Sequence, residues 1–357
     1  MPSTPSAHAS AGVAWSDTER QRHFERWLAP LTQRFELDPA SLAPASSDAS
    51  FRRYLRIHSR ARSFIVMDAP PPQEDVRPFV DIARRINAAG LHAPEILAAD
   101  AAQGFLLLSD LGRTLYLDAL RNAPAADADR LMREAIGALV QWQVRVEPHG
   151  LPPYDGALLR RELQLFPDWC VQREFGLQWS SSEQAIWDTV SELLVASALA
   201  QPRVVVHRDW MPRNLMCSDP NPGILDFQDA VVGPVTYDMA CLLRDAFISW
   251  EEERELDWAV RWWQAARTTP AFAGHAFADD FGECWRALEW MGLQRHLKVL
   301  GIFCRLKHRD GKAHYSTDLP RFFAYATRTA LRYAPLTPLL TLLEPLSGTA
   351  VRAGCTF

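Results

Sequence analysis

The spacing of hydrophobic residues predicts a β-rich beginning of the chain after one N-terminal helix. Residues 17–36 and 76–89 repeat apolar side chains at helical spacing, and Gly90 ends the second run. Four short β-rich runs are separated by turn residues. They lie at residues 51–57, 63–67, 96–99 and 105–108. After the N-terminal helix, the first 110 residues therefore predict a small sheet with one helix.

From residue 112 on, helical periodicity dominates, with one β interruption near residues 204–226. Long apolar runs in several of these helices indicate burial. The pattern predicts an α+β fold with a β-rich domain at 1–111 and a helical domain at 112–357. We expect a cleft between these domains, which is a favoured place for ligands. The predicted helices are 127–146, 157–175, 182–199, 238–247, 251–268, 281–308 and 317–333.

Composition narrows the class of protein. The chain has 357 residues, 38 basic and 43 acidic side chains and a formal charge of −5, so a nucleic-acid partner is not expected. The six cysteines form no CxxC pair, which favours reduced thiols. No secretory signal and no membrane-spanning run is visible, which predicts a cytoplasmic protein without a membrane partner. The sequence leaves the oligomeric state open.

Candidate chemistry gathers where the β interruption begins. Three valines, Val204–Val206, form an apolar strand that ends at His207, and Asp209 and Asn214 follow it. After a turn-rich segment, a second short strand ends at Asp226. A hairpin would return Asp226 to the neighbourhood of Asn214.

This set of residues suits phosphoryl transfer from ATP. Mg²⁺ prefers hard oxygen ligands and binds nucleotide phosphates through one or two protein oxygens plus water, so Asn214 and Asp226 are the predicted metal ligands. Asp209 is the predicted catalytic residue that accepts the proton of the attacking hydroxyl. His207 is predicted to support the loop by hydrogen bonding to backbone near Asp226.

The same stretch resembles the aminoglycoside phosphotransferase and choline kinase superfamily, relatives of the protein kinases. The resemblance rests on His-x-Asp-x4-Asn at 207–214, on Asp226 and on Gly233, Asp238 and Ala240 in a Gly-x4-Asp-x-Ala pattern. It implies a two-lobed, protein-kinase-like fold that uses ATP and Mg²⁺. From the residues alone, Gly233-Pro234 predicts a turn, and Asp238 predicts a carboxylate that caps amides or holds the catalytic loop.

Four segments, two of them from this same stretch, are similar to the bacterial anomeric sugar kinases of cell-wall recycling. They read HRDWMPRNLM, DPNPGILDFQDAVVGPVTYD, SDASFRRYLR and VMDAPPPQED, and the resemblance extends over residues 20–335. It implies that the acceptor is N-acetylmuramic acid or N-acetylglucosamine, phosphorylated at the C1 hydroxyl. The alternatives are a kinase of another small acceptor, such as an aminoglycoside, choline or homoserine, and a nucleotide-binding pseudokinase.

The nucleotide side departs from the superfamily pattern. Members carry a Lys on the third strand of the small lobe, whereas the strand at 64–68 has none. Positive charge from Arg52, Arg53 and Arg56 is a candidate replacement, and the small polar loop before them can hold phosphate through hydroxyls and amides. The predicted nucleotide-binding residues are Ser47, Ser50, Arg52 and Arg53, with Ser109, Asp110 and Leu111 as the hinge that the resemblance implies.

A polar stripe on the apolar helix 281–308 is the candidate acceptor site. A buried polar stripe must be paired or face a cavity, so it predicts either a sugar pocket or a packed salt-bridge network. The stripe comprises Gln294, Lys298, Gly301, Arg305 and His308, of which Gln294, Lys298 and Arg305 are the predicted substrate-binding residues. Gln228 and Asp229 are further candidates, because they point toward the acceptor in related enzymes.

Overall fold

The computed structural model describes residues 13–15, 17–46 and 51–347. The chain divides into two compact units. The first unit comprises the described residues up to 114 together with 216–228, and the second comprises 115–215 together with the described residues from 229 on. The sequence prediction placed 216–228 in the helical domain, whereas this segment associates with the first unit.

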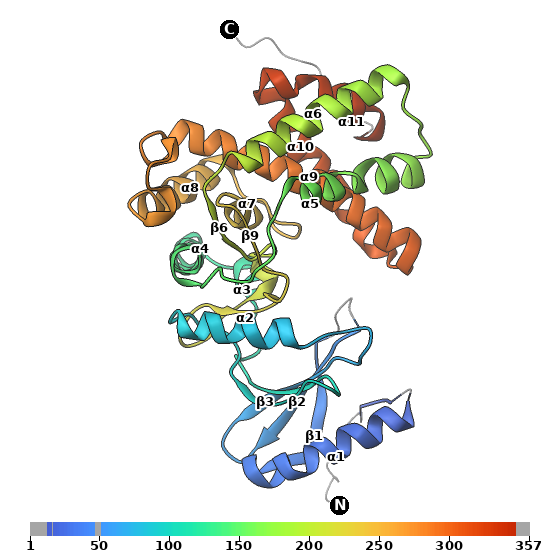
Figure 1. The fold of residues 1–357 in the computed structure, drawn as a ribbon, viewed down its shortest axis with the longest axis vertical. Helices are drawn as coiled ribbons and strands as arrows, with labels where there is room; N and C mark the ends of the chain where they lie inside the picture. The colour runs from blue at the N-terminus through green and yellow to red at the C-terminus, as the bar shows by residue number, and fades with distance from the viewer. Residues whose placement is uncertain (1–12, 16, 47–50, 348–357) are drawn as a thin grey trace, which may run out of the picture. The chain divides into compact units, whose positions relative to one another are not determined.

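The first unit is built on a five-stranded antiparallel sheet in the order β1-β2-β3-β5-β4. Helix α1 (Thr18–Phe35) buries Phe24, Leu28 and Leu31 against apolar side chains of the strands, and α2 (Arg77–Ala88) is the second long helix of this unit (Figure 1). The alternation of side chains along each strand supplies this apolar face. The strands are β1 (Leu37–Ser46), β2 (Arg53–Ser59), β3 (Ser63–Asp68), β4 (Ile96–Asp100) and β5 (Phe105–Ser109).

The second unit is mostly helical, as the periodicity predicts, and the α+β fold class is confirmed. None of the described helices combines the length and the apolar character needed to cross a lipid bilayer. The helices are α3 (Tyr116–Arg121), α4 (Ala125–Arg145), α5 (Gly156–Leu163), the π-helix η1 (Phe166–Glu174), α6 (Ser181–Leu199), α7 (Tyr237–Leu243), α8 (Glu252–Ala266), α9 (Phe281–Asp310), α10 (Leu319–Arg332) and α11 (Leu340–Ser347).

Two short two-stranded sheets and five 3₁₀ turns complete the described elements. Strand β6 (Arg203–Val206) pairs antiparallel with β9 (Val231–Pro234), and β7 (Leu215–Met216) pairs with β8 (Gly223–Ile224). The pairing of β7 with β8 confirms the predicted hairpin. The 3₁₀ turns are η2 (Pro212–Asn214), η3 (Pro270–Phe272), η4 (Ala276–Ala278), η5 (Ala313–Asp318) and η6 (Ala334–Leu339).

Helix α9 is the 30-residue spine of the second unit and packs against η1, α6, α7 and α10. Asp280 caps its first turn, and Gly311 ends it in the left-handed conformation at φ 69°. Gly301 allows the close approach of η1, because a Cβ there would lie 2.3 Å from the backbone of Leu165. The helix is therefore fixed by a contact that only glycine permits.

A fully buried ion network joins α7, α8 and α9. Arg244, at the end of α7, donates to Glu255 at 3.0 Å and to Glu289 at 2.8 Å, and all three side chains are excluded from water. Arg328 and Arg332 of α10 add donors to the same two carboxylates. Buried carboxylates need such partners, because an uncompensated buried charge is strongly destabilising.

Several sequence predictions about elements are wrong. The single helix predicted at 157–175 is interrupted after Leu163, because Pro167 has no N–H to donate to the preceding turn, and the chain continues as η1. Gly233-Pro234 is part of strand β9 and not a turn, and the turn follows at Val235–Thr236. Gly233 is needed because a Cβ there would lie 2.6 Å from the Cβ of Tyr154. Strand β1 and helix α11 were not expected.

Candidate active site

The candidate catalytic loop begins where buried strand β6 ends. His207 has no exposed surface, and its ring lies against the rings of Trp142 and Trp210. The indole of Trp142 also donates to the carbonyl of Val205 at 2.8 Å. The apolar strand and the two tryptophans therefore fix the start of the loop from the core side.

Asp238 holds this loop from helix α7. Its two carboxylate oxygens accept the backbone N–H groups of His207 at 2.7 Å and of Arg208 at 2.9 Å. Burial raises the pKa of Asp238 to about 7. The nearby charge of Asp209 also raises this pKa, whereas the two hydrogen bonds lower it. The sequence prediction that Asp238 holds the loop is confirmed by these bonds.

Asp209 is half-buried, and its backbone is held on both sides. Its N–H donates to Nδ1 of His207 at 3.2 Å, and its carbonyl accepts from the side-chain amide of Asn214 at 3.0 Å. These bonds engage the main chain of Asp209 and not its carboxylate. A carboxylate on a rigid loop is what a positioned proton acceptor requires.

Asn214 lies in the 3₁₀ turn η2 and is buried. Its backbone N–H donates to the carbonyl of Met211 at 2.8 Å. Because the side-chain nitrogen faces the carbonyl of Asp209, the orientation of the amide is set by the loop itself. Hydrogen bonds thus bring His207, Asp209 and Asn214 together in the second unit.

Arg208 has an unusual backbone conformation for an arginine, with φ 78°. Its Nη2 donates to Oε1 of Glu162 on α5 at 2.6 Å, and Lys298 of α9 approaches the same oxygen at 2.9 Å. Burial alone would raise the pKa of Glu162, but the charges of Lys298 and Arg208 outweigh it and lower the pKa. Sequence reasoning missed Glu162, since nothing in the helical pattern of α5 distinguishes it.

The predicted polar stripe of α9 separates into two clusters. Gln294 and Lys298 join Glu162, whereas His308 pairs with Glu174 at 2.6 Å. Arg305 lies about 10 Å farther along the helix axis than Lys298, given a rise of about 1.5 Å per residue. Arg305 is therefore not part of the Glu162 cluster.

In the first unit, Asp226 follows strand β8 and adopts a left-handed backbone conformation with φ 60°. Its carboxylate accepts the side-chain amide of Gln228 at 2.9 Å, and it interacts electrostatically with Arg52. Arg52 also pairs with Glu74 at 3.1 Å. Asp226, Gln228 and one of the predicted arginines are thus gathered in one place, whereas Asp229 belongs to the second unit and is exposed.

Arg53 faces a different side of the sheet. It has the same strand parity as Leu55 and Ile57, which pack against α1. There it forms an ion pair with Asp68, which Arg20 of α1 also binds at 2.6 Å. Of the two arginines predicted to bind nucleotide, Arg52 therefore lies near Asp226, whereas Arg53 pairs with Asp68 on the face of the sheet that α1 covers.

The predicted hinge residues are held by hydrogen bonds within the first unit. The Ser109 hydroxyl accepts the backbone N–H of Glu95 at 2.8 Å, and Asp110 accepts from Arg56 and Ser63 at 2.6 Å each. Burial would raise the pKa of Asp110, but these two donors outweigh it and lower the pKa. Leu111 is buried. Ser47 and Ser50, the other two predicted nucleotide contacts, lie outside the described residues.

The donor chemistry of these residues suits a hard divalent cation. Across the described residues, no three His, Cys, Asp or Glu side chains gather into a metal-binding group. Asp226 offers a carboxylate and Asn214 an amide oxygen, and these are ligand types that Mg²⁺ accepts alongside phosphate and water. The five cysteines in the described part of the chain are all free thiols.

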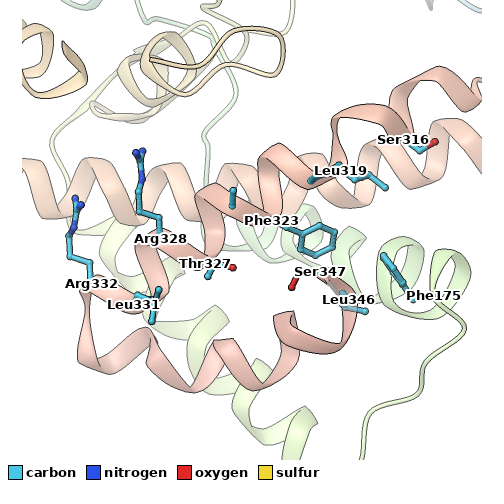
Figure 2. Close-up of a pocket in the computed structure, with 12 residues that line it drawn as sticks. Phe175, Ser316, Leu319, Phe323, Thr327, Arg328, Leu331, Arg332, Leu346 and Ser347 are labelled. Carbon is cyan, nitrogen blue, oxygen red and sulfur yellow. The ribbon is translucent and has the colours of Figure 1, made fainter. Parts of the chain in front are cut away.

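A cavity of the second unit lies away from these residues (Figure 2). It has a volume of about 810 Å³ and is lined by α10, the end of α11 and Phe175. Arg328 and Arg332 at its edge belong to the buried ion network. None of the predicted site residues lines this cavity.

Comparison with known proteins identifies the family. The model of the phosphotransferase enzyme family matches residues 41–279, which is more than half of the chain. The chain belongs to this family, and it is a small-molecule kinase that uses a nucleotide and a divalent metal ion.

The curated relatives carry one name. An N-acetylmuramate/N-acetylglucosamine kinase of Pseudomonas aeruginosa is 52% identical over 339 residues, covering 93% of this chain and 98% of the relative. A protein of the same name from Neisseria meningitidis is 43% identical and covers 92% of this chain and 97% of its own length.

Solved structures share the fold at low identity. A choline kinase of Streptococcus pneumoniae is 10% identical with a TM-score of 0.59, covering 87% of this chain and 100% of that one. An ADP-bound aminoglycoside phosphotransferase is 14% identical with a TM-score of 0.55, covering 88% of this chain and 99% of that one. The predicted kinase-like fold is confirmed by these structures.

Proposed function

We propose that this protein is an ATP- and Mg²⁺-dependent kinase that phosphorylates N-acetylmuramic acid and N-acetylglucosamine at the anomeric C1 hydroxyl. The observation that carries the proposal is the 52% identity with the Pseudomonas aeruginosa kinase over 98% of that relative's length. The reaction consumes ATP, so we propose that it takes place in the cytoplasm and serves peptidoglycan recycling.

Asp209 is the proposed catalytic residue. The C1 hydroxyl of the sugar attacks the terminal phosphorus of ATP, its proton passes to the Asp209 carboxylate, and ADP leaves. The bonds from His207 and Asn214 to the Asp209 main chain support this role, because phosphoryl transfer depends mainly on positioning and charge stabilisation. Asp238 of α7 holds the same loop through its bonds to the N–H groups of His207 and Arg208.

Asp226 is the proposed principal metal ligand, and Asn214 is the second. When bound, Mg²⁺ neutralises charge that develops on the phosphates. The carboxylate of Asp226 already accepts the amide of Gln228, which fixes one of its oxygens. Gln228 and Asp229 are proposed to approach the acceptor sugar.

Arg52 is the proposed replacement for the strand Lys that this chain lacks. It is charged, it lies within electrostatic range of Asp226, and Glu74 holds it in place. A guanidinium with this support can bind nucleotide phosphates. Backbone groups of Ser109, Asp110 and Leu111 are proposed to bind the adenine edge.

The anomeric assignment has a chemical rationale. The ring oxygen withdraws electron density from C1, so the anomeric hydroxyl is more acidic than an ordinary alcohol. A carboxylate of modest basicity, such as Asp209, can therefore assist its attack.

The test uses acceptors that differ only at C1. We expect ATP consumption with N-acetylglucosamine and N-acetylmuramic acid, none with their methyl glycosides, and a product that releases phosphate in mild acid. NMR of the product should show phosphorus coupling to C1. Turnover of a methyl glycoside, or an acid-stable product, would reject the anomeric assignment and leave a kinase of another hydroxyl.

A further inference from the structure

Arg208 occupies a backbone position that suits glycine better than arginine. Its φ of 78° lies in the left-handed region, which costs a residue with a Cβ about 1 kcal/mol or more. The N–H groups of His207 and Arg208 both donate to the carboxylate of Asp238. An arginine at this position therefore carries a backbone strain that glycine would avoid.

The side chain of Arg208 enters a polar cluster centred on Glu162. Oε1 of Glu162 receives Arg208 at 2.6 Å and Lys298 at 2.9 Å. Oε2 accepts the hydroxyl of Tyr154 and, at 3.4 Å, the amide of Gln294. Four donors surround one carboxylate, so the hydrogen-bonding capacity of Glu162 is used within the protein.

Around Glu162 itself, two cations meet one carboxylate. Glu162 faces two cations, Arg208 and Lys298, and burial raises the pKa of the adjoining Tyr237 to about 12, so this phenol stays neutral. Lys298 donates to the Tyr237 hydroxyl at 3.0 Å. The carboxylate of Asp209 acts electrostatically on Lys298, and the guanidinium of Arg295 acts on Tyr237.

Within the cluster, Arg208 is the member nearest to solvent. Its side chain is 22% exposed, against 11% for Lys298 and 6% for Glu162. Its Nε and the Oε1 of Gln294 have no hydrogen-bond partner, so the cluster holds a donor and an acceptor that are unsatisfied. Buried polar atoms without partners are costly.

Arg208 also directly precedes Asp209, so their Cα atoms are about 3.8 Å apart. An acceptor that binds Arg208 must reach both the solvent-exposed part of the guanidinium and the Asp209 carboxylate. Guanidinium groups favour carboxylates, because their planar donors match two carboxylate oxygens.

We propose that Arg208, supported by Glu162 and Lys298, binds the lactyl carboxylate of N-acetylmuramic acid and so favours the acidic acceptor over the neutral N-acetylglucosamine. This inference rests on the proposed function and adds a residue that determines specificity within it. The N-acetyl and hydroxyl groups that both sugars share would be bound by other residues.

The test compares three acceptors with wild-type protein and Arg208→Gly: N-acetylmuramic acid, its uncharged methyl ester and N-acetylglucosamine. Glycine suits φ 78°, so the variant should retain its fold, which thermal melting checks. We expect kcat/KM for the acid to fall about 10- to 100-fold, the range for a lost charged hydrogen bond. Values for the ester and the neutral sugar should change less than about threefold.

Arg160→Ala is the matched control, because Arg160 lies on the same helix as Glu162 and pairs with the exposed Glu192. It should change none of the three values. Equal losses on all three acceptors in Arg208→Gly would mean that Arg208 only positions Asp209, and no loss would mean that it does not bind acceptor. Either result overturns the inference while the proposed function stands.

Failure of the proposed function is recognised separately. If wild-type protein phosphorylates neither sugar, calorimetric titration with N-acetylmuramic acid and its methyl ester still tests the inference. Binding of the acid that exceeds binding of the ester, and that Arg208→Gly abolishes, supports the carboxylate site. Equal binding of acid and ester, or no binding of either, rejects it.

Discussion

At the scale of single residues, the carboxylate of Asp209 carries the clearest prediction. Asp209→Asn keeps the size of the side chain and the main-chain bonds to His207 and Asn214 but removes the proton acceptor. Turnover should fall by about 10²- to 10⁴-fold, the usual contribution of a general base. Melting temperature and ATP binding should match those of the wild type. Activity within threefold of wild type would contradict the role of Asp209.

The proposed metal ligands make a second prediction at this scale. Asp226→Ala should abolish Mg²⁺-dependent ATP binding in calorimetry, because a carboxylate supplies the charge that the ion needs. Asn214→Ala should be milder, since an amide oxygen is a weaker ligand. Undiminished binding of Mg-ATP by Asp226→Ala would remove Asp226 from the metal site.

Asp238 predicts a pH dependence of stability. Burial raises its pKa from 3.8 to about 7, so the folded protein binds this proton more tightly than the unfolded chain does. Its contribution to the free energy of unfolding is therefore full below about pH 4 and is lost as pH rises to about 7.

The test is urea unfolding of wild type and Asp238→Asn at a series of pH values between about pH 4.5 and 8. The free energy of unfolding should fall less steeply with rising pH in the variant than in wild type. The variant should still lose some stability as the pH rises to about 6, because burial raises the pKa of Asp245 to about 6. Identical pH slopes for the two proteins would contradict the shifted pKa of Asp238.

The motif residues of the site were predictable because their chemistry is tied to sequence spacing. His207, Asp209 and Asn214 lie within eight consecutive positions, and the local turn alone brings them together. Glu162 was not predictable, because its partners Arg208 and Lys298 are 46 and 136 positions away. The sequence pattern assigns Arg53 to the nucleotide. In the structure Arg53 pairs with Asp68, and the two residues become neighbours only because β2 pairs with β3.

At the scale of elements, two helical glycines form a matched pair. Gly301→Ala would place a Cβ 2.3 Å from the Leu165 backbone and force α9 from η1, at a cost of about 1–3 kcal/mol in the free energy of unfolding. A Cβ added at Gly137 of α4 would meet no atom within 4 Å, so Gly137→Ala should stabilise by about 0.5–1 kcal/mol. Urea unfolding of both variants tests the pair, and equal effects would contradict the contact.

Element prediction succeeded where the apolar period was regular and failed where proline or glycine mattered. Helices α1, α4 and α6 were predicted close to their observed ends. The segment of β1 contains two prolines and few β-branched residues, and it becomes a strand only by pairing with β2. Strand β9 escapes prediction because Gly233-Pro234 usually marks a turn, whereas here Gly233 makes room for Tyr154.

At the scale of the whole molecule, the order of elements along the chain did not reveal which unit each belongs to. Residues 216–228 follow the catalytic loop in sequence but associate with the first unit, so the main chain passes between units at three points. Hydrophobic periodicity describes local structure and carries no information about such an exchange. The predicted division at 111/112 therefore leaves out a segment that a linear reading cannot assign.

This interleaving limits how the gene can be recombined. A fragment that ends at residue 114 lacks the 13 residues 216–228, and with them Asp226 and the Phe227 ring that lies 4.7 Å from Phe79. A chimera that exchanges the first unit for that of a relative must therefore carry two separate segments from the same parent. A single crossover near residue 114 would instead pair a foreign α2 with a native Phe227, and the mismatch would lie directly beside the proposed metal ligand.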